Sequence, residues 1–271
     1  MDFLYYPIIF IYGLAFGSFF NVCIFRIPKG LSLVFPASHC PNCKNLIPWY
    51  HNIPLFSYLF LKGRCAKCRI MISPVYPVIE ILTGIIAVLI FWHLRHLSFS
   101  DWIIRSGIYF VFFGSLLILS VIDIRYFIIP DRFSIGGMVL GVAAATLYPS
   151  LLGFHTAEEG FIHSLVSCGI CFFVLNGIRV LGSAAYKREA MGFGDIKLAG
   201  AFGAFLGWKL GLLSIFLGAM WGSVFGIAAI VFSFQKLRSE IPFGPFLSLG
   251  AFTSFLFGND ILHWYGLRFM M

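Results

Sequence analysis

The sequence carries little charge for its length. Only 11% of its 271 residues are charged and 60% are hydrophobic, whereas roughly a quarter of the residues in a soluble domain are charged. This shortage excludes an ordinary soluble globular protein. Apolar runs of about 17 to 25 residues, long enough to cross a bilayer as helices, recur along the chain. We predict an all-α polytopic membrane protein with about eight transmembrane helices, at 4–26, 77–93, 102–122, 133–152, 161–182, 195–208, 210–233 and 242–258.

Two further absences limit the domain organisation. The first apolar run lacks the basic n-region and the A-x-A-like cleavage site of a signal peptide, so we expect a retained helix. No internal repeat or low-complexity tract stands out. Only one loop is long enough to fold by itself, and we therefore expect a first helix at 1–26, a cytoplasmic loop domain at 27–76 and a membrane domain of about seven helices at 77–271.

Acidic residues are scarcer than basic ones, 11 against 19, which gives a formal net charge of +8. Lys and Arg near the ends of spans are retained in the cytoplasm. If the N-terminus lies outside, all but four of the basic residues fall on the cytoplasmic side, and the four outside are Arg95, Arg105, Lys209 and Arg268. Basic loops beside anionic lipid account for the net charge without a nucleic-acid partner.

The loop at 27–76 contains two C-x2-C pairs, Cys40 with Cys43 and Cys65 with Cys68, separated by 21 residues. Two such pairs place four thiolates around one tetrahedral ion, the usual shell of a structural zinc. Two disulfides are the alternative, but they rarely persist in the reducing cytoplasm. We predict a zinc site that supplies most of the folding free energy of this loop. His39 and His51 are nearby spare ligands, more typical of ordinary polar loop residues.

The remaining three cysteines lie inside apolar runs. Cys168 and Cys171 also have C-x2-C spacing, but within a helix this spacing places both sulfurs on one face, where they pack as small hydrophobic groups. Cys23 receives the same interpretation. We therefore expect core packing at all three positions.

The acidic residues divide by position. Five lie in outer segments under this orientation: Asp2, Asp101, Glu158, Glu159 and Asp260. Two lie in cytoplasmic loops: Glu189 and Glu240. The other four lie at or just inside the cytoplasmic ends of spans: Glu80, Asp123, Asp131 and Asp195. A carboxylate at that depth is costly unless it is paired or functional, so these four are candidate functional residues.

Asp123 and Asp195 lie at similar depth on the same predicted membrane face. If the third and sixth helices are neighbours, the two carboxyls approach one another and cannot both ionise. Two carboxyls sharing one proton activate water in aspartic proteases, and the glycines before Asp195 permit close approach of a substrate strand. The alternative is structural, with the two acids paired to Arg125 and Lys197 at the headgroups.

Six separated motifs together resemble the type IV prepilin peptidases, the bifunctional leader peptidases and N-methyltransferases of type IV pilus and type II secretion systems. The likeness runs from about residue 13 to residue 252, in the family's order, through these segments: GSFFNVCIFRIP, CPNC with WYHNIPLFSYLFLKGRCAKC, YPVIEILTG, IDIRYFIIPD, MGFGDIKLAGAFGAFLGW and IPFGPFLSLGAF. Such an enzyme is a GxGD-type aspartic protease of the bacterial inner membrane.

The resemblance implies that Asp123 and Asp195 are the catalytic aspartates, because the family's first aspartate follows the isoleucine of the ID pair. Asp131, after Pro130, is interpreted as the N-cap of the next helix. Many relatives have an acid two residues after the first aspartate, where this chain has Arg125. The implied reaction cleaves a basic prepilin or pseudopilin leader after a glycine and methylates the new N-terminus from S-adenosylmethionine.

The methyl-transfer half of this expectation rests on the resemblance. No glycine-rich strand–turn–helix marks a site for S-adenosylmethionine. Glu80, beside the cysteine loop, either serves methyl transfer or pairs with Arg69. Two other classes of function remain open, a proton-coupled transporter using the two aspartates as a relay and a non-enzymatic zinc-bearing assembly subunit. Transport is disfavoured because no acid lies near the middle of a span and no paired broken helices are evident.

Overall fold

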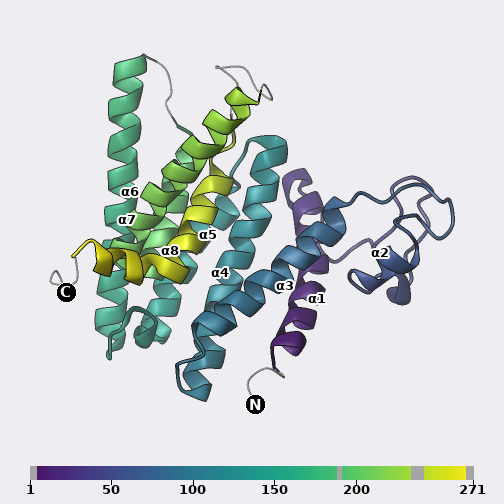
Figure 1. The fold of residues 1–271 in the computed structure, drawn as a ribbon, viewed down its shortest axis with the longest axis horizontal. Coiled ribbons are helices and arrows are strands. Elements are labelled where there is room, and N and C mark those ends of the chain that lie inside the picture. Colours follow the sequence, from purple (N-terminus) through teal and green to yellow (C-terminus); the bar gives the residue numbers. More distant parts are fainter. Residues whose placement is uncertain (1–4, 188–190, 233–240, 267–271) are drawn as a thin grey trace. The chain divides into compact units, whose positions relative to one another are not determined.

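The structure is a computed structural model that describes residues 5–187, 191–232 and 241–266 (Figure 1). Three of the acids assigned above to outer segments or loops, Asp2, Glu189 and Glu240, lie outside the described residues. The described part of the chain is helical apart from its loops and two isolated β-bridges. The α-helices are α1 (Tyr5–Arg26), α2 (Phe56–Phe60), α3 (Val75–His93), α4 (Phe99–Tyr126), α5 (Asp131–Leu147), α6 (Ala157–Tyr186), α7 (Phe193–Val231) and α8 (Gly244–Trp264).

Every apolar window predicted from the sequence overlaps one of these helices, although the window 133–152 runs past the end of α5 at Leu147 into a 3-10 turn at Pro149–Leu152. By length and apolar composition, however, only five helices of the described residues qualify as membrane spans, namely α1, α3, α4, α6 and α7. The other two long helices are α5, which has 17 residues, and α8, which has 21. The coarser prediction of a helical, multi-pass membrane protein is confirmed, and a count of eight spans is not.

Helix α7 covers two predicted windows because it reverses direction at Gly207. This glycine has φ 77° and ψ 165°, a conformation outside the helical range. A Cβ built on Gly211 would lie 3.1 Å from the Cα of Gly203, although residues eight positions apart in one straight helix are separated by about 12 Å. The two halves of α7 therefore form a tight helical hairpin, and the predicted boundary between 195–208 and 210–233 falls at its turn.

The chain divides into two compact units, Met1–Gly114 and Ser115–Met271. In the first unit, α1 and α3 pack closely through glycines. A Cβ on Gly13 would lie 2.6 Å from the Cα of Gly84, and a Cβ on Gly17 would lie 2.6 Å from the Cα of Glu80. Small residues that let two backbones approach are the usual means of joining helices within a membrane. The long loop between α1 and α3 contains α2 (Figure 1).

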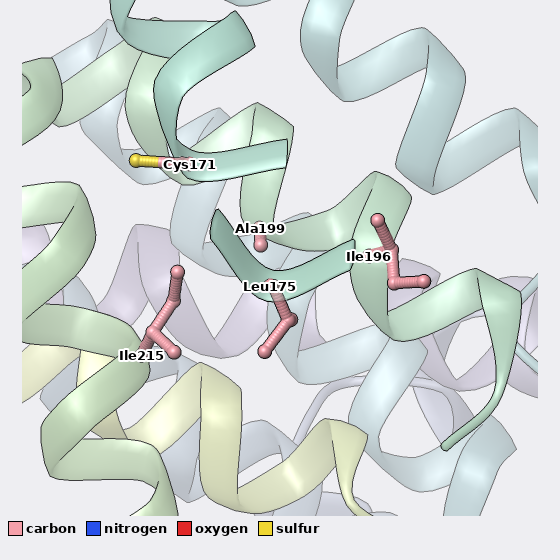
Figure 2. Packing of buried hydrophobic residues seen from close by; sticks show 5 residues of the cluster. All are labelled: Cys171, Leu175, Ile196, Ala199 and Ile215. Atoms are coloured by element: carbon pink, nitrogen blue, oxygen red, sulfur yellow. The ribbon is translucent and has the colours of Figure 1, made fainter. Parts of the chain in front are cut away.

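The second unit has a core between α6 and α7. Figure 2 shows its buried members, which come from both helices: Cys171, Leu175, Ile196, Ala199 and Ile215. The core-packing prediction is confirmed for Cys171, which has no exposed surface, and in the first unit for Cys23, which is also buried. Cys168 is half-buried.

Local signals set the helix ends that matter for the site. Helix α4 ends where Phe127 takes a left-handed conformation, φ 54°, and donates its N–H to the Asp123 carbonyl. Helix α6 begins with a capping box between Thr156 and Glu159. Helix α8 begins at Gly244 and continues with a proline. The N–H that proline lacks would have no partner within the first turn of the helix, so proline is tolerated there.

Candidate active site and metal centre

Asp123 lies in the last turn of α4 and is 5% exposed. Its Oδ2 atom accepts a hydrogen bond of 3.0 Å from the backbone N–H of Gly244, the first residue of α8. The N-terminus of a helix carries partial positive charge and favours an anion beside it. The carboxylate is therefore held by a helix that begins 121 residues later in the chain.

Asp195 is the third residue of α7 and is 7% exposed. It accepts a hydrogen bond from the backbone N–H of Gly192, the N-cap residue, which is one half of a capping box. Its Oδ1 atom is buried and has no hydrogen-bond partner among the residues that the structure describes. Asp123 and Asp195 interact electrostatically, so the two carboxylates that the sequence analysis paired are brought together.

The turn before Asp195 is fixed by packing on both sides. Arg179 of α6 donates from Nε to the carbonyl of Met191, and its guanidinium lies 5.7 Å from the centre of the Phe193 ring. A Cβ on Gly194 would lie 2.8 Å from the Cβ of Ile129. Gly192 has φ −65°, a conformation that other residues also adopt, so the backbone at this position does not require a glycine. The glycine at 194 makes room for the segment that follows α4.

Asp131 does not have the role predicted for it. The N-cap position of α5 is Pro130, and Asp131 is the first helical residue, with no side-chain cap at this end. Its exposed carboxylate forms an ion pair of 2.6 Å with Lys197. This ion pair engages Lys197 outside the dyad and weighs against the alternative in which this lysine neutralises Asp123 or Asp195.

The four loop cysteines converge, as their spacing predicted. Their sulfur atoms all lie within 4.8 Å of one another, and the Sγ atoms of Cys40 and Cys68 are 3.8 Å apart. Sulfurs bound tetrahedrally at about 2.3 Å from zinc would be about 3.8 Å apart, so the donor set fits that ion. Among the described residues this is the one such group of potential ligands, and it includes neither His39 nor His51.

The two cysteine turns have the same local structure, a repeat that the sequence analysis missed. In each turn the backbone carbonyl of the first cysteine accepts a hydrogen bond from the N–H of the residue four positions later. That residue is Lys44 in the first turn and Arg69 in the second, and both have positive φ. A β-bridge closes each turn, from His39 to Leu46 and from Arg64 to Met71. The shared signal is cysteine pairs 25 residues apart, each followed by a basic residue at the left-handed position.

Backbone donors lower the pKa of the Cys65 and Cys68 thiols and so favour their thiolate forms, whereas the neighbouring sulfurs leave the pKa of Cys43 raised. The N–H of Ile70 is the largest influence on Cys68 and lowers the pKa of its thiol to about 6. Hydrogen bonds from Asn42 and from neighbouring cysteines act in the same direction, against partial desolvation. A thiolate is the form that ligates a metal, so the turn supplies at least one ligand already suited to binding.

Glu80 is buried in α3 and 7% exposed. Its Oε2 atom accepts the N–H of Leu55 at 2.8 Å, and the Ser18 side chain also hydrogen-bonds to it. The predicted alternative in which Glu80 pairs with Arg69 is wrong, because the partners of this carboxylate are a loop amide and a hydroxyl.

Comparison with known proteins decides the family. The model described as "Bacterial Peptidase A24 N-terminal domain" matches residues 11–94, and the model described as "Type IV leader peptidase family" matches residues 110–227. Proteins named "Prepilin leader peptidase/N-methyltransferase" match at 39% identity in Klebsiella pneumoniae, 34% in Myxococcus xanthus and 31% in Bacillus subtilis. The matches cover 76%, 82% and 95% of this chain and 87%, 62% and 96% of those relatives. The chain belongs to the type IV leader peptidase family.

The two family regions divide the candidate sites between them. The N-terminal region contains the four cysteines and Glu80, and the leader peptidase region contains Asp123 and Asp195. Gly244, which holds Asp123, lies beyond both matched regions, and sequence reasoning assigned it no role. The signal that could have found it is the Gly-Pro pair at the start of an apolar run, a helix N-terminus with a free N–H. No solved structure matches this leader peptidase family member.

Proposed function

We propose that this chain removes the basic leader of type IV prepilins or pseudopilins after a glycine at the cytoplasmic membrane face, and that it methylates the new N-terminus. The observation that carries the peptidase proposal is the pair of buried, electrostatically interacting carboxylates of Asp123 and Asp195. The names of its relatives supply the substrate class and the second activity. Neither a transporter nor an assembly subunit is favoured by any observation.

The contacts of the two aspartates differ, which suggests different roles in the proposed hydrolysis. Asp123, held by the Gly244 N–H, is suited to carry negative charge and to take a proton from the attacking water. Asp195, whose Oδ1 has no partner within the described part of the chain, is suited to donate a proton to the scissile carbonyl oxygen. Water then bonds to the carbonyl carbon, and the amide nitrogen leaves with a proton returned from the dyad.

The cysteine loop is proposed as a structural zinc domain. Cys40, Cys43, Cys65 and Cys68 would hold the ion, and the closed four-sulfur shell leaves no position open for a substrate. The ion would fold residues 27–76, between a first helix at 1–26 and a membrane domain at 77–271. We further propose eight spans, an outer N-terminus and a cytoplasmic loop, since this arrangement best satisfies the bias of basic residues.

The proposed methyl donor is S-adenosylmethionine. When bound, it supplies an electrophilic methyl group on sulfur, and the amine of the cleaved pilin supplies the nucleophile. The size of the cysteine loop and its proposed cytoplasmic position suggest that it forms part of the donor site.

Co-expression with a prepilin, followed by mass measurement of the pilin N-terminus, tests both activities at once. We expect the mass of a pilin that has lost its leader and gained one methyl group. A prepilin of unchanged mass, with the protein inserted in the membrane, would contradict the proposed peptidase. A cleaved but unmethylated pilin would contradict the methyltransferase.

A further inference from the structure

Glu80 is a buried carboxylate with no part in the proposed hydrolysis. It lies in the second turn of α3 and contacts the cysteine loop through the N–H of Leu55 and α1 through the side chain of Ser18. A buried carboxylate is costly unless it is hydrogen-bonded. These two hydrogen bonds join three segments of the first unit at one side chain.

The loop residue that Glu80 holds is in a strained conformation. Leu55 has φ 60° and ψ −51°, and the N–H of Phe56 donates to the carbonyl of Pro54 at 2.6 Å. Together these describe a tight γ-turn of the rare, strained kind. A leucine stays in such a turn only where its surroundings hold it, and the Glu80 carboxylate is the acceptor for its N–H.

A series of backbone hydrogen bonds leads along the chain from this turn to the second cysteine pair. Leu55 is the N-cap residue of α2. Beyond α2, the N–H of Gly63 donates to the carbonyl of Tyr58 at 2.8 Å, and the N–H of Ile72 donates to the carbonyl of Gly63 at 2.7 Å. Cys65 and Cys68 lie between these last two bonds, so the turn at Leu55 is linked to the cysteine cluster without Glu80 contacting a sulfur.

Glu80 belongs to a closely packed pair of helices, α1 and α3. The Cα of Glu80 faces Gly17 across the closest approach of α1 and α3. One turn away, Asn21 donates from Nδ2 to the carbonyl of Tyr76 at 3.1 Å. A loop attached to Glu80 therefore takes its position from the α1 and α3 helix pair.

We propose that Glu80 is a positioning residue that seats the cysteine loop on α1 and α3 for methyl transfer, by holding the γ-turn at Leu55. The part that concerns methyl transfer rests on the proposed function. What Leu55 requires is an acceptor oxygen, and the charge of Glu80 is not needed for that. Glutamine supplies the oxygen for the Leu55 N–H and an N–H₂ group for Ser18, whereas leucine supplies neither at similar size.

The experiment compares Glu80→Gln, Glu80→Leu and the control Thr83→Val with the unmodified full-length chain in lipid nanodiscs. Thr83 is also buried in α3, and its hydroxyl bonds within the helix at 2.7 Å to Ile79 without reaching the loop. The measurements are zinc content, hydrogen exchange of the segment 53–60, and methylation of a pilin already cleaved of its leader.

Glu80→Leu is expected to exchange faster over 53–60 and to lose methylation on the order of 10-fold to 100-fold, with unchanged zinc. Glu80→Gln and Thr83→Val should behave as the unmodified chain does. An equally defective Glu80→Gln would overturn the proposal, because it would mean that the negative charge itself is needed. Loss of zinc from Glu80→Leu, or normal exchange in it, would overturn it as well. If the unmodified chain failed to methylate cleaved pilin, the proposed function would fail, and the exchange comparison would still decide whether Glu80 holds the loop.

Discussion

Asp123 and Asp195 are buried, as Glu80 is, and differ from it in that their two carboxylates interact with one another. An amide can neither take a proton from water nor share one, so Asp123→Asn and Asp195→Asn should each reduce prepilin cleavage by on the order of 10²-fold to 10⁴-fold. The protein should remain inserted, because asparagine is as large as aspartate and each site stands at the end of a helix. Cleavage assays on membrane fractions with matched amounts of protein measure this.

Asp131→Ala is the matched control for the dyad. It removes an acid from the same end of the helices, but its ion pair with Lys197 is exposed, and such pairs contribute about 0 to 1 kcal/mol. Most of the activity should therefore remain. An inactive Asp131→Ala together with an active Asp123→Asn would reverse the assignment.

Gly244→Ala tests the third component of the site. A Cβ at this position would lie 2.8 Å from Asp123 Oδ2, so the carboxylate has to move away from the N–H that holds it. A displacement of about 1 Å in a reacting group can cost on the order of 100-fold in rate, and we expect a loss of that size in cleavage. Gly136→Ala in α5, where an added Cβ meets nothing within 4 Å, should leave cleavage unchanged; a matching loss there would attribute the effect to helix disturbance.

At the residue scale, the sequence pointed to acidic side chains that are costly to bury in a membrane. It did not point to the backbone groups that hold them. Asp123 and Asp195 could be found because an acid at the edge of an apolar run is costly to bury unless it is paired or functional. Gly244 was missed because the Gly-Pro pair at 244 and 245 marks a helix N-terminus but does not say which carboxylate its N–H would hold. The pairing of Lys197 with Asp131 was also missed, because two residues 66 positions apart meet only through the packing of α5 and α7.

The cysteine loop is the element on which the two proposed activities can be separated. Cys65→Ser with Cys68→Ser removes two of the four converging sulfurs, so zinc should fall well below the expected one ion per chain, and the loop should lose its fold. Asp123 and Asp195 are carried by helices whose backbone hydrogen bonds need no metal. Methylation of a cleaved pilin should therefore fall more than cleavage of a prepilin does.

Metal analysis and the two assays, run on the same preparations, check this prediction. Cys168→Ala is the control, because Cys168 lies in α6 outside the cysteine cluster, and its zinc content should be normal. Full methylation by the double mutant would exclude a role for the loop in methyl transfer, and an equal fall in both activities would indicate that the loop clamps the leader.

Elements were predicted well where hydropathy alone decides them. Each apolar window is largely α-helical, because a backbone in lipid must satisfy its own hydrogen bonds, and 133–152 extends furthest past the end of its helix. The loop at 27–76 was predicted to hold a metal site from its cysteine spacing, but α2 and the γ-turn at Leu55 were not predicted. Their conformations depend on a distant acceptor, Glu80, and no local pattern in the sequence encodes it.

The proposed orientation is a prediction about the whole molecule. Eight spans with an outer N-terminus also place the C-terminus outside. A periplasmically active reporter enzyme fused after Gly266 should be active, and the same reporter fused after Arg69 should be silent because the cysteine loop lies in the cytoplasm. Opposite results at both sites would reverse the orientation, and the same result at both sites would contradict the count of eight spans.

The reversal at Gly207 also affects how this protein fits its bilayer. From Phe193 to Leu206 the first half of α7 rises only about 20 Å, against a hydrocarbon thickness of about 30 Å. Trp208 and Lys209, in contact at the turn, are the residues that anchor a helix end at the interface. Under the proposed orientation the shortfall falls at the cytoplasmic end, and we expect Asp195 about 10 Å inside the hydrocarbon boundary unless the bilayer thins around it. A thinned bilayer would bring water to the dyad without requiring the substrate helix to leave the lipid.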